Sequence, residues 1–153
     1  MQDSYLYGLI ERYQAATFTV TRRVHSELRA HLGDDLTLEQ YSILRYIRGK
    51  PSTTSTELAE VFDVGKSAIT SIITKLADKA MLIRIPDDSD RRVIRLTLTE
   101  AGSNAARRTD EWIVHWLSGY LKHFSLEEVE AFIQSFERLA ALITTDERGS
   151  ERS

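Results

Sequence analysis

Residues 54–102, TSTELAEVFDVGKSAITSIITKLADKAMLIRIPDDSDRRVIRLTLTEAG, decide the fold of this chain. Their pattern predicts, in order, a short helix, a turn, a second helix and a two-stranded hairpin. In the second helix, expected over residues 66–79, apolar side chains recur at the spacing that places them on one buried stripe. This predicted buried stripe consists of Ile69, Ile72, Ile73 and Leu76.

Another face of the same helix is small and hydrophilic. Hydroxyl side chains repeat along it at helical spacing between two lysines, so the face carries hydrogen-bonding groups and positive charge without bulk. Taken alone, this pattern describes a solvated helix face equally well, but a face of this kind also fits the major groove of DNA. The side chains expected to contact DNA from it are Lys66, Ser67, Thr70, Ser71, Thr74 and Lys75.

The hairpin follows this helix. Residues 93–98 alternate between polar and apolar side chains with the period of a strand, and the short apolar stretch 82–85 supplies the partner strand. Between them, residues 86–92 are rich in Pro, Asp and Ser, which favour a turn that projects into solvent. A charged hairpin at this distance from the hydroxyl-rich helix favours DNA binding over a plain solvated face. The dry face of the hairpin is expected to consist of Ile94, Leu96 and Leu98.

Composition bounds the function. A chain of 153 residues suits one compact domain, or a small reading module joined to an assembly module. The absence of cysteine excludes disulfides and thiol chemistry. No apolar run reaches membrane-spanning length and no export signal opens the chain, so we expect a cytoplasmic protein with no membrane partner.

The distribution of charge matters more than its total. The net charge is −3, yet residues 64–108 hold nine Lys or Arg against five acidic residues, a local excess of +4. Because salt screens charges beyond about 8–10 Å, the local sign decides attraction to phosphates. The segment 64–108 is therefore compatible with nucleic acid, and the acidic remainder is expected to face elsewhere.

The flanking segments are helical. Capping boxes at Thr37, Thr54 and Ser125 mark helix starts, and Thr99 is a further N-cap candidate. Long amphipathic helices are expected over residues 4–32, from Thr99 through Phe124, and from Ser125 to Thr145. These helices carry more apolar surface than a small reading head can cover, which predicts a symmetric dimer through the terminal helices.

Five motifs together, TSTELA at 54–59, KSAIT at 66–70, the segment 76–84, DRR at 90–92 and LTEAG at 98–102, resemble the MarR family of bacterial winged helix-turn-helix transcription regulators. The likeness spans nearly the whole chain. It implies a mainly α fold with a small β-hairpin wing, and a homodimer formed by long terminal helices.

In domain terms, the expected division is a discontinuous helical dimerisation region, 1–34 and 103–145, a winged helix-turn-helix domain, 35–102, and a flexible tail, 146–153. Carried over by position, the resemblance assigns major-groove and phosphate contacts to the helix residues. It assigns minor-groove insertion to Arg92, with Asp90 as the carboxylate that orients it and Arg91 beside them. The helix residues that match are Lys66, Ser67, Thr70, Ser71 and Lys75.

Two positions depart from the family pattern. Ala80 stands where the family usually has glycine after the recognition helix. Because a left-handed residue there would cost alanine about 1 kcal/mol, we expect a differently wound helix exit. Gly65 stands where a serine-type cap is common, and it offers no side-chain oxygen.

Other kinds of site are weaker candidates. Aromatic residues could line a pocket for a small lipophilic or aromatic effector, but each is more simply explained by core packing. The histidines lack metal-ligand spacing, and no catalytic constellation stands out, so no cofactor, no metal and no enzymatic activity are predicted. The aromatic residues concerned are Phe18, Tyr41, Tyr46, Trp112 and Trp116.

These inferences point to a dimeric, sequence-specific DNA-binding transcription regulator, a ligand-responsive repressor of a pseudo-palindromic operator. Two alternatives stay open. One is an architectural binder of double-stranded DNA with little sequence preference. The other is a protein-interaction module whose reading head has lost DNA binding.

Overall fold

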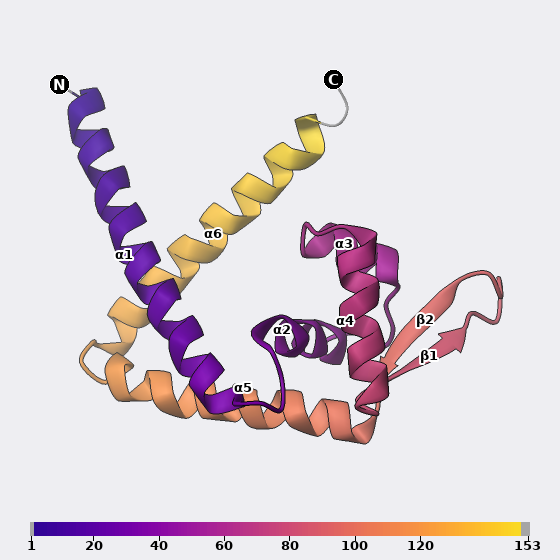
Figure 1. Ribbon diagram of the computed structural model, residues 1–153. Helices are drawn as coiled ribbons and strands as arrows, with labels where there is room; N and C mark the ends of the chain where they lie inside the picture. The colour runs from indigo at the N-terminus through magenta and orange to yellow at the C-terminus, as the bar shows by residue number, and fades with distance from the viewer. Residues whose placement is uncertain (1, 151–153) are drawn as a thin grey trace. The chain divides into compact units, whose positions relative to one another are not determined.

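In a computed structural model, the described residues, 2–150, form six helices and one antiparallel hairpin (Figure 1). This is the predicted mainly α architecture with a small β-hairpin wing. The elements are α1 (Gln2–Leu32), α2 (Leu38–Arg48), α3 (Ser55–Val61), α4 (Lys66–Asp78), β1 (Leu82–Pro86), β2 (Ile94–Leu98), α5 (Glu100–Leu121) and α6 (Leu126–Ser150).

Two compact units make up the chain, residues 1–111 and residues 112–153. The first holds α1 to α4, the hairpin and the start of α5. α6 continues to Ser150, within the segment predicted to be a flexible tail, and residues 151–153 of that segment lie outside the described residues. The division into a dimerisation region and a reading domain stays a prediction.

The helix starts follow the predicted caps. The boxes at Thr37 and at Ser125 are complete, with the side chain and backbone of each pair bonded reciprocally. Thr54 caps α3 through the Glu57 N–H, but the Glu57 carboxylate does not return to the Thr54 backbone. That part of the prediction is wrong, because the carboxylate binds three other side chains.

Where α4 ends, the chain is left-handed in spite of the missing glycine. Ala80 has φ = 56°, and Met81 N–H and Ala80 N–H bond to the carbonyls of Leu76 and Ala77. This is the Schellman pattern, which places a left-handed residue directly after the helix cap. The expectation of a differently wound exit is therefore wrong, and the chain bears the conformational cost of alanine at this position.

The core of the first unit gathers around α2, α4 and the base of the hairpin. Ile69, Ile73 and Leu76 of α4 are almost completely buried, as their spacing predicts. Ile72, expected on the same stripe, is only half-buried. Their fully buried neighbours include Ile43, Leu44, Ile47, Leu58, Leu82 and Leu96.

The hairpin is anchored at its base and free at its tip. Its strands pair from Leu82 opposite Leu98 to Pro86 opposite Ile94, and Thr53 adds a bridge to Leu96. Leu96 is fully buried, but Ile94 is 39% exposed, so the predicted dry face covers only the base of the wing. The reason is geometric, because the hairpin extends away from the helices of its unit (Figure 1).

Gly102 fixes how α5 meets the end of α4. A Cβ atom at this position would lie 1.9 Å from the carbonyl oxygen of Met81, so only glycine allows this approach. Thr99 ties the same junction, since its hydroxyl donates to the Ala80 carbonyl at 2.7 Å and accepts from the Gly102 N–H. The motif LTEAG thus joins α4, β1 and α5.

Candidate nucleic-acid interface

The hydrophilic face of α4 lies in solvent, as predicted. All six of its candidate DNA-binding residues are exposed, and the buried stripe holds the helix from the other side. Among the described residues, no acidic side chain pairs with Lys66 or Lys75. Their charges are therefore available to phosphates. The six are Lys66, Ser67, Thr70, Ser71, Thr74 and Lys75.

Two hydroxyls of this face already have partners. The Thr70 hydroxyl donates to the Lys66 carbonyl at 2.8 Å, which leaves its oxygen able to accept. The Thr74 oxygen accepts a 2.9 Å bond from the guanidinium of Arg84, on β1. Arg84 thus reaches from the wing to α4, a contact that the sequence analysis did not single out. The available signal was one arginine within an otherwise apolar strand.

Arg92 at the wing tip is held in place by its own loop. Its Nε lies 3.1 Å and its Nη2 3.3 Å from the Asp90 carboxylate, which also accepts from the Arg92 N–H. The side chain of Arg92 is 91% exposed and points into solvent. Its bonds to Asp90 fix the direction in which it points. These bonds from Arg92 hold the pKa of Asp90 below its usual value.

A second ion pair shapes the turn below the tip. Asp87 lies 3.3 Å from the Arg95 guanidinium, and its N–H donates to the Val93 carbonyl at 2.8 Å. The Val93 N–H closes the loop on the Asp90 carbonyl. Arg91 is exposed and makes no ion pair within the described residues. The tip therefore carries two outward cations on a loop braced by two aspartates.

Glu57 braces the helix-turn-helix from behind. Its carboxylate accepts from Thr53 Oγ1 at 2.5 Å and Tyr46 Oη at 2.8 Å, and it forms an ion pair with Lys50. Lys50, then Thr53 and Tyr46, lower the pKa of Glu57 to about 2. The brace links α3 to α2 and to the segment that bridges to β2.

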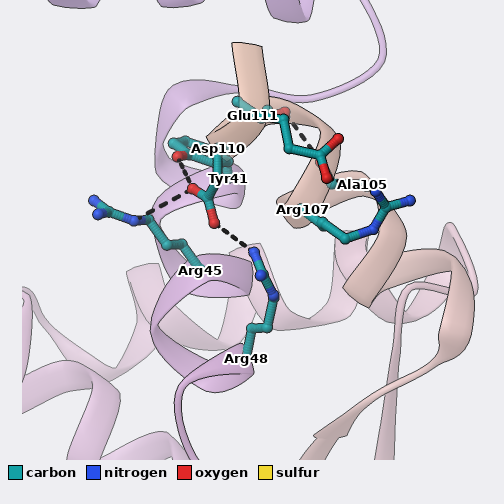
Figure 2. Close-up of polar contacts among 8 residues, drawn as sticks. Tyr41, Arg45, Arg48, Ala105, Arg107, Asp110 and Glu111 are labelled. Atoms are coloured by element: carbon teal, nitrogen blue, oxygen red, sulfur yellow. Dashed lines mark hydrogen bonds and ion pairs between the residues drawn. The ribbon is translucent and has the colours of Figure 1, made fainter. Parts of the chain in front are cut away.

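A second brace joins α2 to α5 (Figure 2). One oxygen of Asp110 accepts from Tyr41 Oη at 2.6 Å and lies 3.4 Å from Arg45 Nε, and the other meets Arg48 Nη1 at 2.5 Å. Burial and the bond to Asp110 raise the pKa of the Tyr41 hydroxyl, which donates to the Asp110 carboxylate. This network joins α2 to the start of α5.

The aromatic residues weighed for an effector pocket have other neighbours. Tyr41 bonds to Asp110, and Tyr46 packs edge-on against Phe62 with ring centroids 5.9 Å apart. A cavity of about 710 Å³ near the end of α1 is lined by none of the five predicted aromatics. Trp112 and Trp116 stack with ring centroids 6.0 Å apart. Phe18, which is 68% exposed, lines an open hollow of about 470 Å³ along α1.

Two further features bear on the kind of protein. Within residues 2–150, no group of three or more His, Cys, Asp or Glu side chains is placed to hold a metal ion. In that same part of the chain, no helix combines the length and the apolar character that a bilayer crossing requires.

Comparison with known proteins agrees with this geometry. The sequence pattern of the MarR family matches residues 36–94, the segment from α2 to the start of β2. The uncharacterized HTH-type transcriptional regulator YpoP of Bacillus subtilis (strain 168) is 28% identical over 118 residues, which cover 77% of this chain and 73% of the relative. The HTH-type transcriptional repressor MdtR of the same organism is 28% identical over 113 residues, covering 74% of this chain and 73% of the relative.

Among solved structures, the chain is similar to FabT of Streptococcus pneumoniae, crystallised in complex with DNA. The TM-score is 0.74 at 21% identity, with 91% of this chain and 98% of that chain covered. At this identity the likeness concerns the fold. It includes the long terminal helices and the two-stranded wing.

Proposed function

Because the chain belongs to the MarR family of winged helix-turn-helix, DNA-binding transcription regulators, we propose that it represses a promoter by binding a pseudo-palindromic operator as a homodimer. In this proposal α4 enters the major groove and the wing arginine Arg92 enters the adjacent minor groove. Repression follows from occlusion of the promoter.

The observation that carries the proposal is the joint exposure of two cationic devices on one unit. On α4, Lys66 and Lys75 flank exposed hydroxyls, and on the wing Arg92 is oriented by Asp90. Hydroxyls and lysines suit base edges and phosphates, whereas an ordered arginine suits the concentrated negative potential of a narrow minor groove. Arg84 adds a cation between the two devices, where it can meet the phosphate backbone.

Apolar exposure supports the homodimer. On α1, Leu6 and Phe18 are 56% and 68% exposed, and on α6 Phe132 is 63% exposed. Apolar surface of this extent on a single chain marks an interaction site. A second copy is the economical partner, because a two-fold dimer presents two reading heads to two operator half-sites. Light scattering should then give a mass near twice 17.5 kDa.

A ligand response belongs to the same proposal. A small effector would release the operator if it bound more tightly to a dimer whose two recognition helices are spaced wrongly for successive major grooves. Such an effector shifts the equilibrium only as far as its affinities for the two states differ.

The decisive experiment compares the protein's own upstream intergenic region with a scrambled duplex of equal length, at two salt concentrations. We expect a strong preference for the intergenic region that persists at the higher salt. Equal, salt-labile binding to both duplexes would favour an architectural binder. Absence of binding at both salts would favour a protein-interaction module.

Arg92→Ala tests the wing. We expect operator affinity to fall on the order of tenfold, and the salt dependence to drop by about one charge, because a groove contact and a cation are both lost. The free energy of unfolding should stay within about 0.5 kcal/mol of wild type, since the side chain is exposed. Fluorescence anisotropy and urea unfolding measure the two quantities. Operator affinity equal to that of wild type would refute the wing assignment.

A further inference from the structure

A cavity of about 230 Å³ lies on the buried side of α4, away from the predicted DNA-contacting face. Its walls come from α1, α2, the turn between α3 and α4, and α4 itself. We call it the rear cavity. Its apolar wall consists of Leu38, Ile43, Phe62, Val64, Ile69 and Ile72.

Three apolar residues that line the rear cavity are incompletely buried. Ile72 should be inward by its spacing, yet it is half-buried, as is Phe62, and Val64 is 41% exposed. The space holds roughly eight water molecules at about 30 Å³ each, and water beside an apolar wall makes few hydrogen bonds there. An apolar group that displaces such water gains affinity.

The polar rim selects the charge of an occupant. It contributes His25 from α1 with Glu39 and Ser42 from α2, and Ser42 Oγ already donates to the Leu38 carbonyl. Within the described part of the chain, neither His25 nor Glu39 has an ion pair or a side-chain hydrogen bond. No Lys or Arg belongs to the lining. One unpaired carboxylate in a lining without Lys or Arg attracts an ammonium group and repels a carboxylate.

We propose that the rear cavity binds a small apolar amine in its protonated form, a single ring or short branched chain whose ammonium group lies beside Glu39. The volume is below the 300–1,000 Å³ common for drug-sized ligands, which limits the occupant to a compact molecule. The ring would contact Ile69 and Ile72, and the ammonium group would lie on the side of His25 and Glu39.

The position of the rear cavity would let a bound ligand change operator binding, a step that rests on the proposed function. One molecule would touch α1, the expected dimerisation helix, and the back of α4, the expected reader of the major groove. An occupant that fits one spacing of α1 and α4 better than another shifts the population between them. The coupling is reciprocal: the ligand changes the affinity for the operator by the same factor by which bound operator DNA changes the affinity for the ligand.

Methyl NMR on protein labelled at the isoleucine δ1 positions tests the site without using DNA. The probes are benzylamine, protonated at pH 7, with benzyl alcohol and benzoate as its neutral and anionic counterparts. We expect benzylamine to shift the Ile69 and Ile72 methyl signals saturably, and to leave Ile133 and Ile143 of α6 unmoved. Benzyl alcohol should bind more weakly, and benzoate should bind least.

Glu39→Gln separates charge recognition from simple apolar binding. It should weaken benzylamine about threefold and leave benzyl alcohol unchanged, because an exposed ion pair contributes little more than this. Glu60→Gln, an exposed α3 carboxylate outside the lining, is the matched control and should change neither. Benzoate binding as tightly as benzylamine, a preference for amine that survives Glu39→Gln, or no saturable shift would each overturn the site.

Operator anisotropy with and without saturating benzylamine then tests the regulatory step. A change in operator affinity that Glu39→Gln reduces supports it, and unchanged affinity at full occupancy refutes it. Failure of the proposed function looks different, because a protein that binds no operator would still show the methyl shifts.

Discussion

The recognition helix α4 and the wing present their cations by opposite means. α4 is held from behind by Ile69, Ile73 and Leu76, all almost fully buried, so its exposed face is positioned by the core. The wing extends away from that core, and Arg92 is ordered by Asp90 from the same loop. One device depends on packing across the unit, whereas the other depends on contacts two residues apart.

This difference predicts two kinds of mutational effect. Changes behind α4 should act on the free energy of unfolding, because the hydroxyl face moves only when the core does. Changes at the wing tip should act on operator affinity, because the tip contributes little buried surface. The junction of Ala80, Thr99 and Gly102 lies between them, and a change that displaces its backbone should show both effects.

Ile73→Ala removes a buried side chain that packs α4 against the core, and we expect it to cause the largest loss of stability. The side chain is 1% exposed, and its truncation leaves a cavity, so we expect a loss of about 2–5 kcal/mol in the free energy of unfolding. Ser71→Ala, on the exposed face, is the matched control and should change stability by less than about 0.5 kcal/mol while weakening operator binding. Urea unfolding measures both variants. Similar stability losses in the two would contradict the assigned orientation of α4.

Gly102→Ala changes the contact between α5 and Met81 at the base of the wing. The new Cβ would meet the Met81 carbonyl at 1.9 Å, so backbone must shift, and we expect a loss of about 1–3 kcal/mol. Because Met81 directly precedes β1, operator affinity of the folded protein should fall as well. Gly8→Ala, where added bulk meets nothing within 4 Å, is the control. A Gly102→Ala protein as stable as wild type would show that the close approach is absent in solution.

Ala80→Gly should stabilise the junction between the end of α4 and the base of the wing. Ala80 has φ = 56°, a conformation that costs alanine about 1 kcal/mol relative to glycine, and the two bonds of the Schellman pattern are retained. We expect a gain of about 1 kcal/mol in the free energy of unfolding with unchanged operator affinity. Thermal and urea unfolding measure the gain. A loss of stability would mean that the exit of α4 is not left-handed in the folded protein.

Local patterns predicted most of the fold. The helix starts at Thr37, Thr54 and Ser125, the buried stripe of α4 and the Asp90–Arg92 pair all depend on residues within a few positions of one another. Periodicity and capping report such short-range relations directly. At Ala80 the expected conformation was wrong, because the chain adopts the left-handed conformation there without glycine.

Long-range pairings could not be predicted in this way. The bond from Arg84 to Thr74 and the network around Asp110 join residues whose neighbours in sequence give no sign of them. The exposure of Ile94 has a similar origin, because strand alternation predicts a face but not how far the helices extend beneath it. Glu57 shows competition, since three side-chain donors took the carboxylate that a complete capping box needs.

Asp90→Asn weakens the contact that orients Arg92, and we expect it to have the smallest effect in this series of variants. The amide keeps the size but loses the charge that orients Arg92, so operator affinity should fall about two- to threefold with no change in stability. The pKa of Asp90 is lowered from 3.8, so the ordering is present above that value and is lost as pH falls through the lowered value. Wild-type affinity should therefore show no pH dependence that arises from Asp90 between pH 6 and 8. A loss as large as that of Arg92→Ala would mean that Asp90 does more than orient its neighbour.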